Sequence, residues 1–401
     1  DHHEVGEKLP NAIAVVDAKR KDNTYPFREL AGVGVGFKLI QAISQKLELE
    51  EKEYLKYLDI VCIGTISDIV PLVDENRVIA KLGLKLVEVT KNIGLKALID
   101  VAGYKQIDSF TVSFGLAPRI NACGRMGHSY KALDLLLEND FEKATELAGE
   151  IKEFNNERQL QEKYIFEDAN RQIKEKHLEN EDCIILGGSS WHSGVIGIVA
   201  SKITEMYYKP SILICFEDDK DIGKGSGRSI QGFDLHDALM KCKDFLAGFG
   251  GHSMAVGVSV AKDNFENFKE EFLKLAKEAD ISSFVPVLNI DAVLNIDDIN
   301  KQMVESLSLL EPFGEANTQP IFAFKGLKIQ SIRSLTDGKH LKLSLKSNNN
   351  TFVNAIGFNL GYLASEFTIG DKVDVAGNLE INSFNGVDSV QINLKDVMKS
   401  I

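Results

Sequence analysis

Residues 183–207 read CIILGGSSWHSGVIGIVASKITEMY. The apolar run 183–186 is typical of a buried strand, the glycines and serines after it indicate a turn, and the following residues have the composition of a helix. A second apolar run at 211–216 predicts another strand. Because strands that alternate with helices are typical of α/β folds, this stretch predicts an α/β unit.

Two segments that follow these strands favour ligand binding. Residues 223–229 read GKGSGRS and combine glycines, hydroxyls and two cations without an acid, which favours an anion-binding strand or turn. Residues 249–252 read FGGH, and a histidine after two glycines is exposed to whatever approaches the loop. A lone histidine is nevertheless more often structural. A helix over 264–278 is expected to close the unit.

Upstream of this unit the composition changes to that of a long helix. Residues 139–182 are rich in Glu, Lys and Gln, and no proline occurs between Pro118 and Pro210. Apolar residues in the first part of the stretch recur at helical spacing. The stretch therefore predicts a helical connector between two domains.

Residues 114–128 read FGLAPRINACGRMGH and carry two arginines separated by small residues. Arg119 and Arg125 stand six positions apart with no acid between them, and arginine forks bind phosphate oxygens in a bidentate manner. A surface loop with two solvated arginines explains the pattern equally well.

The chain begins with a compact group of candidate metal ligands, Asp1-His2-His3. Imidazole and carboxylate are both metal donors, although a tag remnant or a solvated chain end has the same residues. A further candidate is Asp68 in the segment GTISDIVPL. Pro71 disfavours helix at the preceding residue, so Asp68 is expected near the end of an element. A helix cap or a solvated acid is the commoner role of such a residue.

Other elements are predicted near the N-terminus. Residues 11–17, NAIAVVD, predict a buried strand, and helices are expected over 54–69, 80–89 and 94–101. Residues 31–39, AGVGVGFKL, contain three alternating glycines. These indicate either a phosphate-binding loop that opens a helix or, as the favoured interpretation, tight packing between a strand and a helix.

From about residue 286 the chain is β-rich. Strands are predicted at 321–324, 328–331, 341–345, 354–358, 372–379 and 390–394. Their number and shortness indicate a small barrel such as the OB-fold. The first two hairpins are strongly basic, with Lys325, Lys328, Arg333, Lys339, Lys342 and Lys346 against the single acid Asp337. Three phenylalanines are expected either to stack on bases or to fill the core, namely Phe322, Phe324 and Phe352.

Bulk composition limits the class of protein. A chain of 401 residues is expected to hold two or three domains. Its net charge of -13 argues against a globally basic nucleic-acid-coating protein but permits a local basic groove. Five cysteines without a CxxC pair indicate neither a zinc site nor a disulfide framework, so a reducing cytoplasm is expected. No membrane span or signal peptide is indicated, and a first residue other than Met fits an excised segment.

The order of these motifs is more specific than any one of them. DHH, GTISDIVPL, PRINACGRM, SGRS and GGHSMAVG follow one another along the chain. This order resembles the DHH phosphoesterase superfamily with its DHHA1-type second domain, and within it the RecJ family of bacterial single-strand-specific exonucleases. The resemblance implies two α/β domains joined by a long helix and followed by an OB-fold-like barrel. The expected parts are 1–138 (the C-terminal part of a DHH domain), 139–181 (the connector), 182–281 (the DHHA1-type domain) and 286–401 (the barrel).

The resemblance also implies an activity and a site. It implies digestion of single-stranded DNA from 5′ to 3′, in DNA repair and recombination, with a two-metal site holding Mn2+ or Mg2+. The implied metal ligands are Asp1, His2 and Asp68, and the implied catalytic residues are His2, His3, Asp68 and His252. The implied substrate-binding residues are Arg119, Asn121, Arg125, Ser226, Arg228, Ser229, Gly250, Gly251 and His252. Single-stranded-DNA-binding protein and a RecQ-type helicase are the implied protein partners, and no membrane is involved.

The chain departs from the family pattern at its start. Two earlier motifs of the family supply further Asp and His ligands, and no residue precedes Asp1. We therefore expect only part of a binuclear site and an inactive chain in isolation. Two alternatives stay open, a dinucleotide or nano-RNA phosphodiesterase of the same superfamily and a non-catalytic module that binds single-stranded DNA.

Overall fold

The computed structural model describes residues 2–400 apart from residues 4, 7, 218 and 385. These residues divide into two compact units. The first comprises Asp1–Val89, Gln106–Ser113 and Leu288–Ile401, and the second comprises Thr90–Lys105 and Phe114–Val287. Among the described residues, every helix is too short or too polar to span a membrane.

The first unit opens with a helical layer. Its helices are α1 (Gly32–Lys46), α2 (Lys52–Leu55), α3 (Leu58–Ser67), α4 (Asp74–Val87) and the single turn α6 (Ser109–Thr111). Helix α3 is almost entirely buried, and α1 and α4 pack against it. The helix predicted over 54–69 is thus two helices. The first of them begins at Lys52, and the second ends before Asp68.

The strand predicted at residues 11–17 is wrong. The segment has irregular structure, and Ile13 is fully exposed. An apolar run forms a strand only where a neighbour completes its hydrogen-bond ladder, and no strand of the described residues pairs with this segment. The alternating glycines lie inside α1 rather than in a loop, and Gly34 packs against Leu30. The glycines thus serve close packing, but the predicted packing between a strand and a helix is wrong, because the described residues form no strand before α1.

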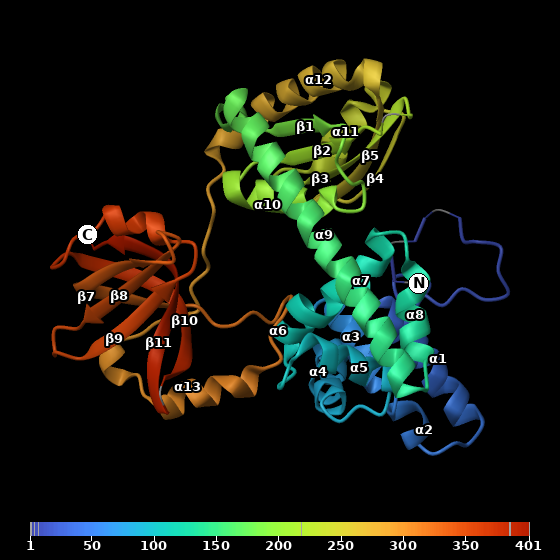
Figure 1. Cartoon of the computed structure of the whole chain (residues 1–401), viewed down its shortest axis with the longest axis horizontal. Helices are drawn as coiled ribbons and strands as arrows, with labels where there is room; N and C mark the ends of the chain where they lie inside the picture. The colour runs from blue at the N-terminus through green and yellow to red at the C-terminus, as the bar shows by residue number, and fades with distance from the viewer. Residues whose placement is uncertain (1, 4, 7, 218, 385, 401) are drawn as a thin grey trace. The chain divides into compact units, whose positions relative to one another are not determined.

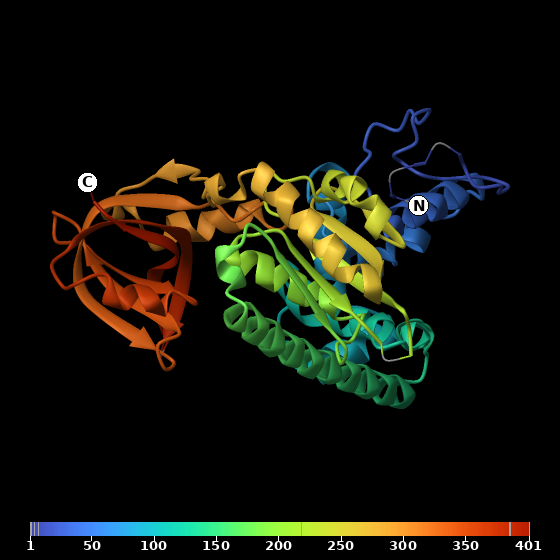
Figure 2. The ribbon, with the colours of Figure 1, turned by 90° about the horizontal axis from the view of Figure 1, so that it is seen from above.

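The rest of the first unit is a closed barrel. Its strands are β6 (Ala292–Val293), β7 (Phe322–Leu335), β8 (His340–Lys346), β9 (Phe352–Gly357), β10 (Lys372–Phe384) and β11 (Val387–Lys399), and helix α13 (Lys301–Leu307) precedes β7. The strand order is β10-β11-β9-β8-β7-β6, and pairing of β10 with β7 closes the ring, which Figure 2 shows. The two strands predicted at 321–324 and 328–331 are one strand, β7, with Gly326 at a positive φ of 67° between them.

The second unit has a five-stranded sheet and a set of helices. The strands are β1 (Ile184–Gly188), β2 (Ser211–Cys215), β3 (Ile222–Arg228), β4 (Gly248–Gly251) and β5 (Ala255–Ala261), in the order β1-β2-β3-β5-β4. The helices are α5 (Ile93–Ala102), α7 (Ala117–Arg125), α8 (Ser129–Leu137), α9 (Phe141–Glu175), α10 (Ile196–Tyr207), α11 (Leu235–Lys241) and α12 (Phe265–Glu278).

Apolar residues on alternate positions of β1 and β2 give this sheet two cores. Ile184, Leu186 and Leu213 face α9 and α10. Ile185 and Ile212 face α11 and α12. Figure 1 shows α10 and α12 on opposite faces of the sheet. Only β1 and β2 are parallel in this sheet, which makes it the mixed α/β layer that the sequence predicts.

The predicted long helix is confirmed as α9, which begins where the Asp140 carboxylate accepts hydrogen bonds from the amides of Glu142 and Lys143. It contacts α5, α7, α8 and α10, all in the second unit. The PRINACGRM segment is not a loop but helix α7, with Pro118 in its first turn, where a missing N–H costs nothing. The glycines of FGGH are in the short edge strand β4, which sequence patterns missed.

Candidate functional site

His2 and Asp68 meet at the end of a buried helix in the first unit. Asp68 is the C-cap residue of α3, where Ile69 takes a positive φ of 58° and Pro71 prevents further helix. His2 Nε2 lies 2.8 Å from Asp68 Oδ2. The rings of His2 and His3 lie 4.3 Å apart, centroid to centroid. The structure thus brings Asp68 beside the adjacent pair His2 and His3, from which it is 65 or more positions away in the sequence.

Gly32 leaves space for the side chain of His2. A Cβ added at Gly32 would lie 3.1 Å from His2 Nδ1, which is tighter than an ordinary contact. Sequence reasoning grouped Gly32 with a phosphate loop or with packing and missed its place beside His2. The glycine at position 32 was visible in the sequence, but His2 lies 30 positions away, and only the fold shows that the two residues are neighbours.

The His2–Asp68 pair fits part of a metal site. An imidazole nitrogen and a carboxylate oxygen converge, and this mixed donor set suits Mn2+ and tolerates Mg2+. Within the described part of the chain, no group of three or more His, Cys, Asp or Glu residues converges as a full metal site would require. The third predicted ligand, Asp1, lies outside the described residues. The described geometry therefore supplies two donors.

The second unit contains a groove with a floor of glycines. A Cβ added at Gly248 or Gly250 would meet open space, and one at Gly257 would find only the Gly250 carbonyl oxygen, 4.0 Å away. Of these glycines, Gly248 and Gly257 border a cavity of about 470 Å³. Its remaining walls come from Ser193, Gly194 and Ile196 before and in α10, and from Lys224, Gly225, Phe249, Val258 and Ser259.

Strand β3 places a row of polar side chains on one face, and Lys224 of this row lines the groove. Successive residues of a strand point to opposite faces, so Lys224, Ser226 and Arg228 share one face. Arg228 Nη1 donates to Ser226 Oγ (2.9 Å) and to the Gly227 carbonyl oxygen (2.8 Å). A Cβ added at Gly197 in α10 would lie 3.0 Å from Ser226 Oγ. Gly197, a residue that sequence reasoning missed, thus lets the first turn of α10 approach β3.

Arg228 and Arg125 lie within electrostatic range of each other. Partial desolvation, and then the positive charge of Arg125, lower the pKa of Arg228. Partial desolvation and the charge of Arg158 lower the pKa of Arg125, an effect that Glu162 partly offsets. Arginine nevertheless remains charged in proteins. Arg228 is half-buried and Arg125 is exposed. Two cations that repel each other form a site that a bound anion would stabilise.

The other arginine of α7 has a different environment. Arg119 Nη1 donates to the Gly115 carbonyl oxygen (2.6 Å), and its guanidinium carbon lies 5.7 Å from the centre of the Tyr104 ring. Six residues of helix turn the chain by about 600°, so Arg119 and Arg125 point in different directions. Asn121, between them, is exposed. The structure therefore places Arg125, and not Arg119, near Arg228.

Two predicted binding residues have structural contacts. Ser229 is buried, its hydroxyl donates to the Phe233 carbonyl oxygen (2.7 Å), and its amide donates to the Met254 carbonyl oxygen (3.0 Å). Gly251 has a φ of 136°, and a Cβ there would lie 2.3 Å from the Ala255 carbonyl oxygen. We therefore assign Ser229 and Gly251 to the turns that shape the groove.

His252 stands directly after β4 at the edge of the sheet. Its amide donates to the Ala255 carbonyl oxygen (2.9 Å), and its side chain is exposed. The short hydrogen-bonded turn between β4 and β5 fixes its backbone. The imidazole of His252 is therefore exposed at the end of a glycine-rich strand.

The barrel carries a separate basic face. Leu341, Leu343 and Leu345 fill the barrel core, so the alternate residues Lys342 and Lys346 point outward. In register on the neighbouring strand β7, Arg333 lies opposite Lys342 and Lys328 lies opposite Lys346. Like charges directly opposite each other are destabilising, which makes this face a site that an anionic chain would stabilise.

Aromatic side chains stand at both ends of this face. The Lys346 ammonium lies 5.3 Å from the centre of the Phe352 ring, and Phe352 is 58% exposed. At the other end, the rings of His340 and Phe358 lie 5.3 Å apart. Of the three phenylalanines singled out in the sequence, Phe322 and Phe324 are in the barrel core, and only Phe352 is available for stacking.

Family models match two parts of this chain. The DHHA1 domain model matches residues 180–278, and the RecJ OB domain model matches residues 290–396. The chain is 33% identical over 419 residues to the single-stranded-DNA-specific exonuclease RecJ of Dickeya dadantii, and the match covers 98% of this chain and 71% of that protein. The chain belongs to the RecJ family.

Other members of the RecJ family extend this result. The chain is 37% identical over 404 residues to RecJ of Bacillus subtilis, a match that covers all of this chain and 50% of that protein. The chain thus spans half the length of this relative. The structure of RecJ from Thermus thermophilus in complex with Mn2+ matches with a TM-score of 0.85 at 31% identity, covering 100% of this chain and 58% of that chain.

Proposed function

We propose that the protein is a metal-dependent exonuclease that hydrolyses single-stranded DNA from the 5′ end towards the 3′ end, in DNA repair and recombination. The observation that carries the proposal is that Arg125 and Arg228 lie within electrostatic range of each other near an open groove lined by glycines, in a chain of the RecJ family. Several relatives are named single-stranded-DNA-specific exonucleases. A terminal phosphate supplies the anion that the two arginines lack.

Roles for the groove residues follow from their contacts. Arg228, held by Ser226, and Arg125 bind the phosphate at the end of the strand through charge-assisted hydrogen bonds. The open backbone of Gly250 and Gly257 lets the strand approach the sheet closely. His252, exposed at the end of β4, contacts the scissile phosphate.

The metal proposal rests on the first unit. Relatives from Thermus thermophilus form complexes with Mg2+ and with Mn2+. We propose that His2 and Asp68, together with Asp1, hold such an ion, and that His3 orients the neighbouring imidazole. When bound, a metal pair activates the attacking water and stabilises the leaving oxygen of the phosphodiester.

The barrel is proposed to bind single-stranded DNA through its basic outer face. Lys342 and Lys346 neutralise phosphates, and Phe352 stacks on a base. Matches of family models to residues 180–278 and 290–396 support domain boundaries at 182–281 and 286–401, with 1–138 and 139–181 before them. Single-stranded-DNA-binding protein and a RecQ-type helicase are the proposed protein partners, and a cytoplasmic location stays a prediction.

The test is a digestion assay with defined ends. Single strands labelled at the 5′ or the 3′ end, and the matching duplex, are incubated with Mn2+ and a longer form of the protein in which the upstream residues are restored. We expect products from the 5′ end of single strands. Digestion only from the 3′ end, or equal digestion of the duplex, contradicts the proposal. Faster turnover of dinucleotides than of long strands would favour the phosphodiesterase alternative, which the relatives do not support.

For the 401-residue chain by itself, we propose a second activity, binding of single-stranded DNA without cleavage. The basic outer face of the barrel favours it, and the described residues bring together two metal donors. Such binding should weaken steeply with salt, because each neutralised phosphate releases counterions. Robust cleavage by this chain at high Mn2+ contradicts this second proposal.

A further inference from the structure

We propose that Asp168 and Trp191 are positioning residues that fasten the loop between β1 and α10 (residues 189–195) and thereby hold Arg125 in place beside Arg228. The inference rests on the phosphate-binding role proposed above. It assigns a function in the groove to two residues that do not themselves border it.

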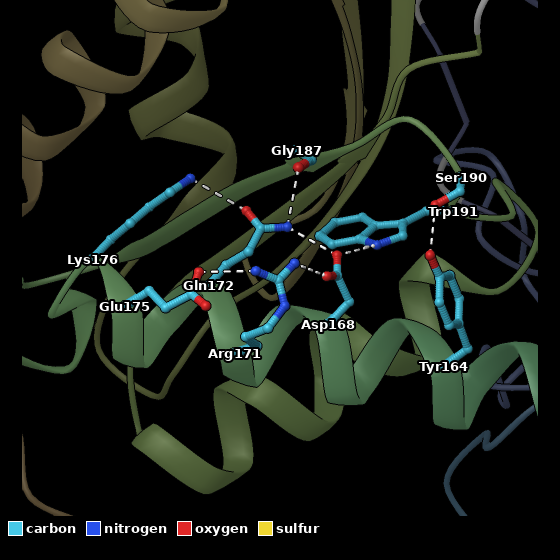
Figure 3. A network of polar contacts seen from close by, with 9 residues as sticks. All are labelled: Tyr164, Asp168, Arg171, Gln172, Glu175, Lys176, Gly187, Ser190 and Trp191. Atoms are coloured by element: carbon cyan, nitrogen blue, oxygen red, sulfur yellow. Dashed lines mark hydrogen bonds and ion pairs between the residues drawn. The ribbon is translucent and has the colours of Figure 1, made fainter.

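Trp191 is the only tryptophan of the chain, and it is 3% exposed. Its indole Nε1 donates to Asp168 Oδ2 (3.0 Å), a contact that Figure 3 shows. The same carboxylate oxygen accepts from Gln172 Nε2 (3.0 Å), and the other oxygen pairs with Arg171. Burial would raise the pKa of Asp168, but these three hydrogen bonds outweigh it and lower the pKa. The indole therefore meets a carboxylate that is ionised and fixed.

Helix α9 holds the adjoining residues as well. Gln172 Nε2 also contacts the Gly187 carbonyl oxygen (3.4 Å), and the hydroxyls of Tyr164 and Ser190 lie 2.7 Å apart. From β2, the Cys215 thiol donates to the Trp191 carbonyl oxygen (2.7 Å). The start of the loop is thus attached to α9 through Ser190 and Trp191 and to β2 through Trp191, and Trp191 is the buried one of the two.

The end of the same loop contacts Arg125. The Gly194 carbonyl oxygen accepts from Arg125 Nη1 (3.1 Å). A Cβ added at Gly194 would lie only 2.3 Å from the Arg125 backbone carbonyl oxygen. The Gly194 amide in turn donates to His192 Nδ1 (3.1 Å), which keeps the loop compact. A shift of Trp191, three residues away, would move both the groove wall at Gly194 and the acceptor that orients Arg125.

This geometry separates a positioning role from simple core packing. If Trp191 only fills space, Trp191→Phe leaves an aromatic ring in place and should leave phosphate binding unchanged. If the indole N–H fastens the loop, then Trp191→Phe and Asp168→Ala should cause the same defect, and the double variant should be no worse than either single variant. Asp168→Asn keeps an acceptor for the indole and should restore most of the function.

The experiment measures the preference of the 401-residue chain for a phosphorylated end. A labelled oligonucleotide is competed away by unlabelled strands of one sequence carrying either a 5′ phosphate or a 5′ hydroxyl, without added metal. We expect Trp191→Phe and Asp168→Ala each to reduce the preference by about tenfold, the scale on which supporting residues tune a site. Affinity for the 5′-hydroxyl strand should not change.

A matched control is available on the same helix. Glu175 pairs with Arg171 (2.9 Å) on the exposed side of the network and touches neither Asp168 nor Trp191. Glu175→Gln should leave the preference unchanged. Thermal unfolding of each variant is recorded in parallel. If Trp191→Phe is unfolded at the assay temperature, the comparison of Asp168→Ala, which removes the acceptor of the indole and should lose the preference, with Asp168→Asn, which keeps an acceptor and should retain it, decides the question.

The outcomes distinguish the inference from the function on which it rests. A native chain without any preference for the 5′ phosphate overturns the proposed phosphate site, and this inference with it. A native chain that shows the preference, with variants that retain it, overturns the inference alone. An equal loss of affinity for both strands, together with a lower melting temperature, assigns Asp168 and Trp191 a purely structural role and also overturns it.

Discussion

The groove of the second unit and the outer face of the barrel are both proposed to bind phosphates of single-stranded DNA, and they present their cations differently. Near the groove, Arg228 is half-buried and donates two hydrogen bonds to Ser226 and Gly227. On the barrel, Lys342 and Lys346 are cations on the outer side of a strand. We propose that the first arrangement binds one phosphate in a fixed position and that the second binds phosphates at several equivalent positions.

This difference suggests how one chain can recognise a particular strand end and also bind a strand of any sequence. A half-desolvated guanidinium with a fixed direction distinguishes one phosphate geometry from another. Exposed lysines attract any polyanion, and their contribution falls with salt. We therefore expect recognition of the strand end to depend on the groove and general affinity for the strand to depend on the barrel.

The largest expected effect is that of Arg228→Ala. The preference for a 5′-phosphorylated strand should fall by about a hundredfold, the scale of removing one partner of a desolvated charge pair. Arg228→Lys keeps the positive charge but loses the planar pair of donors, so its preference for the phosphorylated strand should lie between those of the native chain and Arg228→Ala. The melting temperature should not fall, because Arg228 and Arg125 repel each other. Competition binding and calorimetry measure both effects, and an unchanged preference contradicts the role of Arg228.

Filling the floor of the groove should have the next largest effect. Gly257→Val adds a side chain where the nearest atom is 4.0 Å away, so the sheet should tolerate it while the strand end loses its place. We expect about a tenfold weaker binding of the phosphorylated strand, equivalent to roughly 1.4 kcal/mol, with an unchanged melting temperature. Gly251→Ala is the contrasting variant, since its clash with Ala255 should lower the melting temperature. Undiminished binding by Gly257→Val would show that the strand end does not use the groove.

Changes on the barrel should alter salt dependence and leave end recognition intact. The double variant Lys342→Ala/Lys346→Ala should reduce the slope of log affinity against log salt by about 1.4, that is, about 0.7 for each lost phosphate contact of a single strand. Removal of two like-charge cross-strand pairs should not lower stability. Affinities measured over a salt series test this, and a loss of the 5′-phosphate preference would contradict the division of roles.

The smallest expected effect concerns the turn that precedes Phe352. Hydrogen bonds from Thr351, Ser347 and Asn349 lower the pKa of Asp297. A lowered pKa in the folded state contributes stability above the unfolded pKa, and this contribution is lost as pH falls through the folded pKa. The melting temperature of the native chain should therefore exceed that of Asp297→Asn near pH 6, and the difference should shrink from about pH 4 downward. A constant difference over this range contradicts the assignment.

Periodic patterns in the sequence predicted much of this fold. Alternating apolar residues found the barrel strands, and Pro71 located the end of α3 at Asp68. Strand β4 escaped notice because a run of glycines and one phenylalanine has no alternation to detect. The strand predicted at residues 11–17 was wrong because apolar composition alone does not show whether a neighbouring strand is present to pair with the segment.

The candidate site was predicted less completely than the fold. The order of the motifs identified His2, Asp68 and Arg228 as site residues. A motif does not show which of its hydroxyls already donates a hydrogen bond within a turn, as the Ser229 hydroxyl does. Gly32 was undetectable as a neighbour of His2, since such a contact is made by the fold between residues distant in sequence. The same holds for Trp191, whose partner Asp168 lies on another element.

The division of roles between groove and barrel can be tested in one measurement. The ratio of affinities for 5′-phosphorylated and 5′-hydroxyl single strands is determined for the native chain, Arg228→Ala and Lys342→Ala/Lys346→Ala at one salt concentration. We expect the native ratio to persist in the barrel variant and to approach one in Arg228→Ala. A ratio that survives Arg228→Ala, or that disappears with the barrel lysines, contradicts the account.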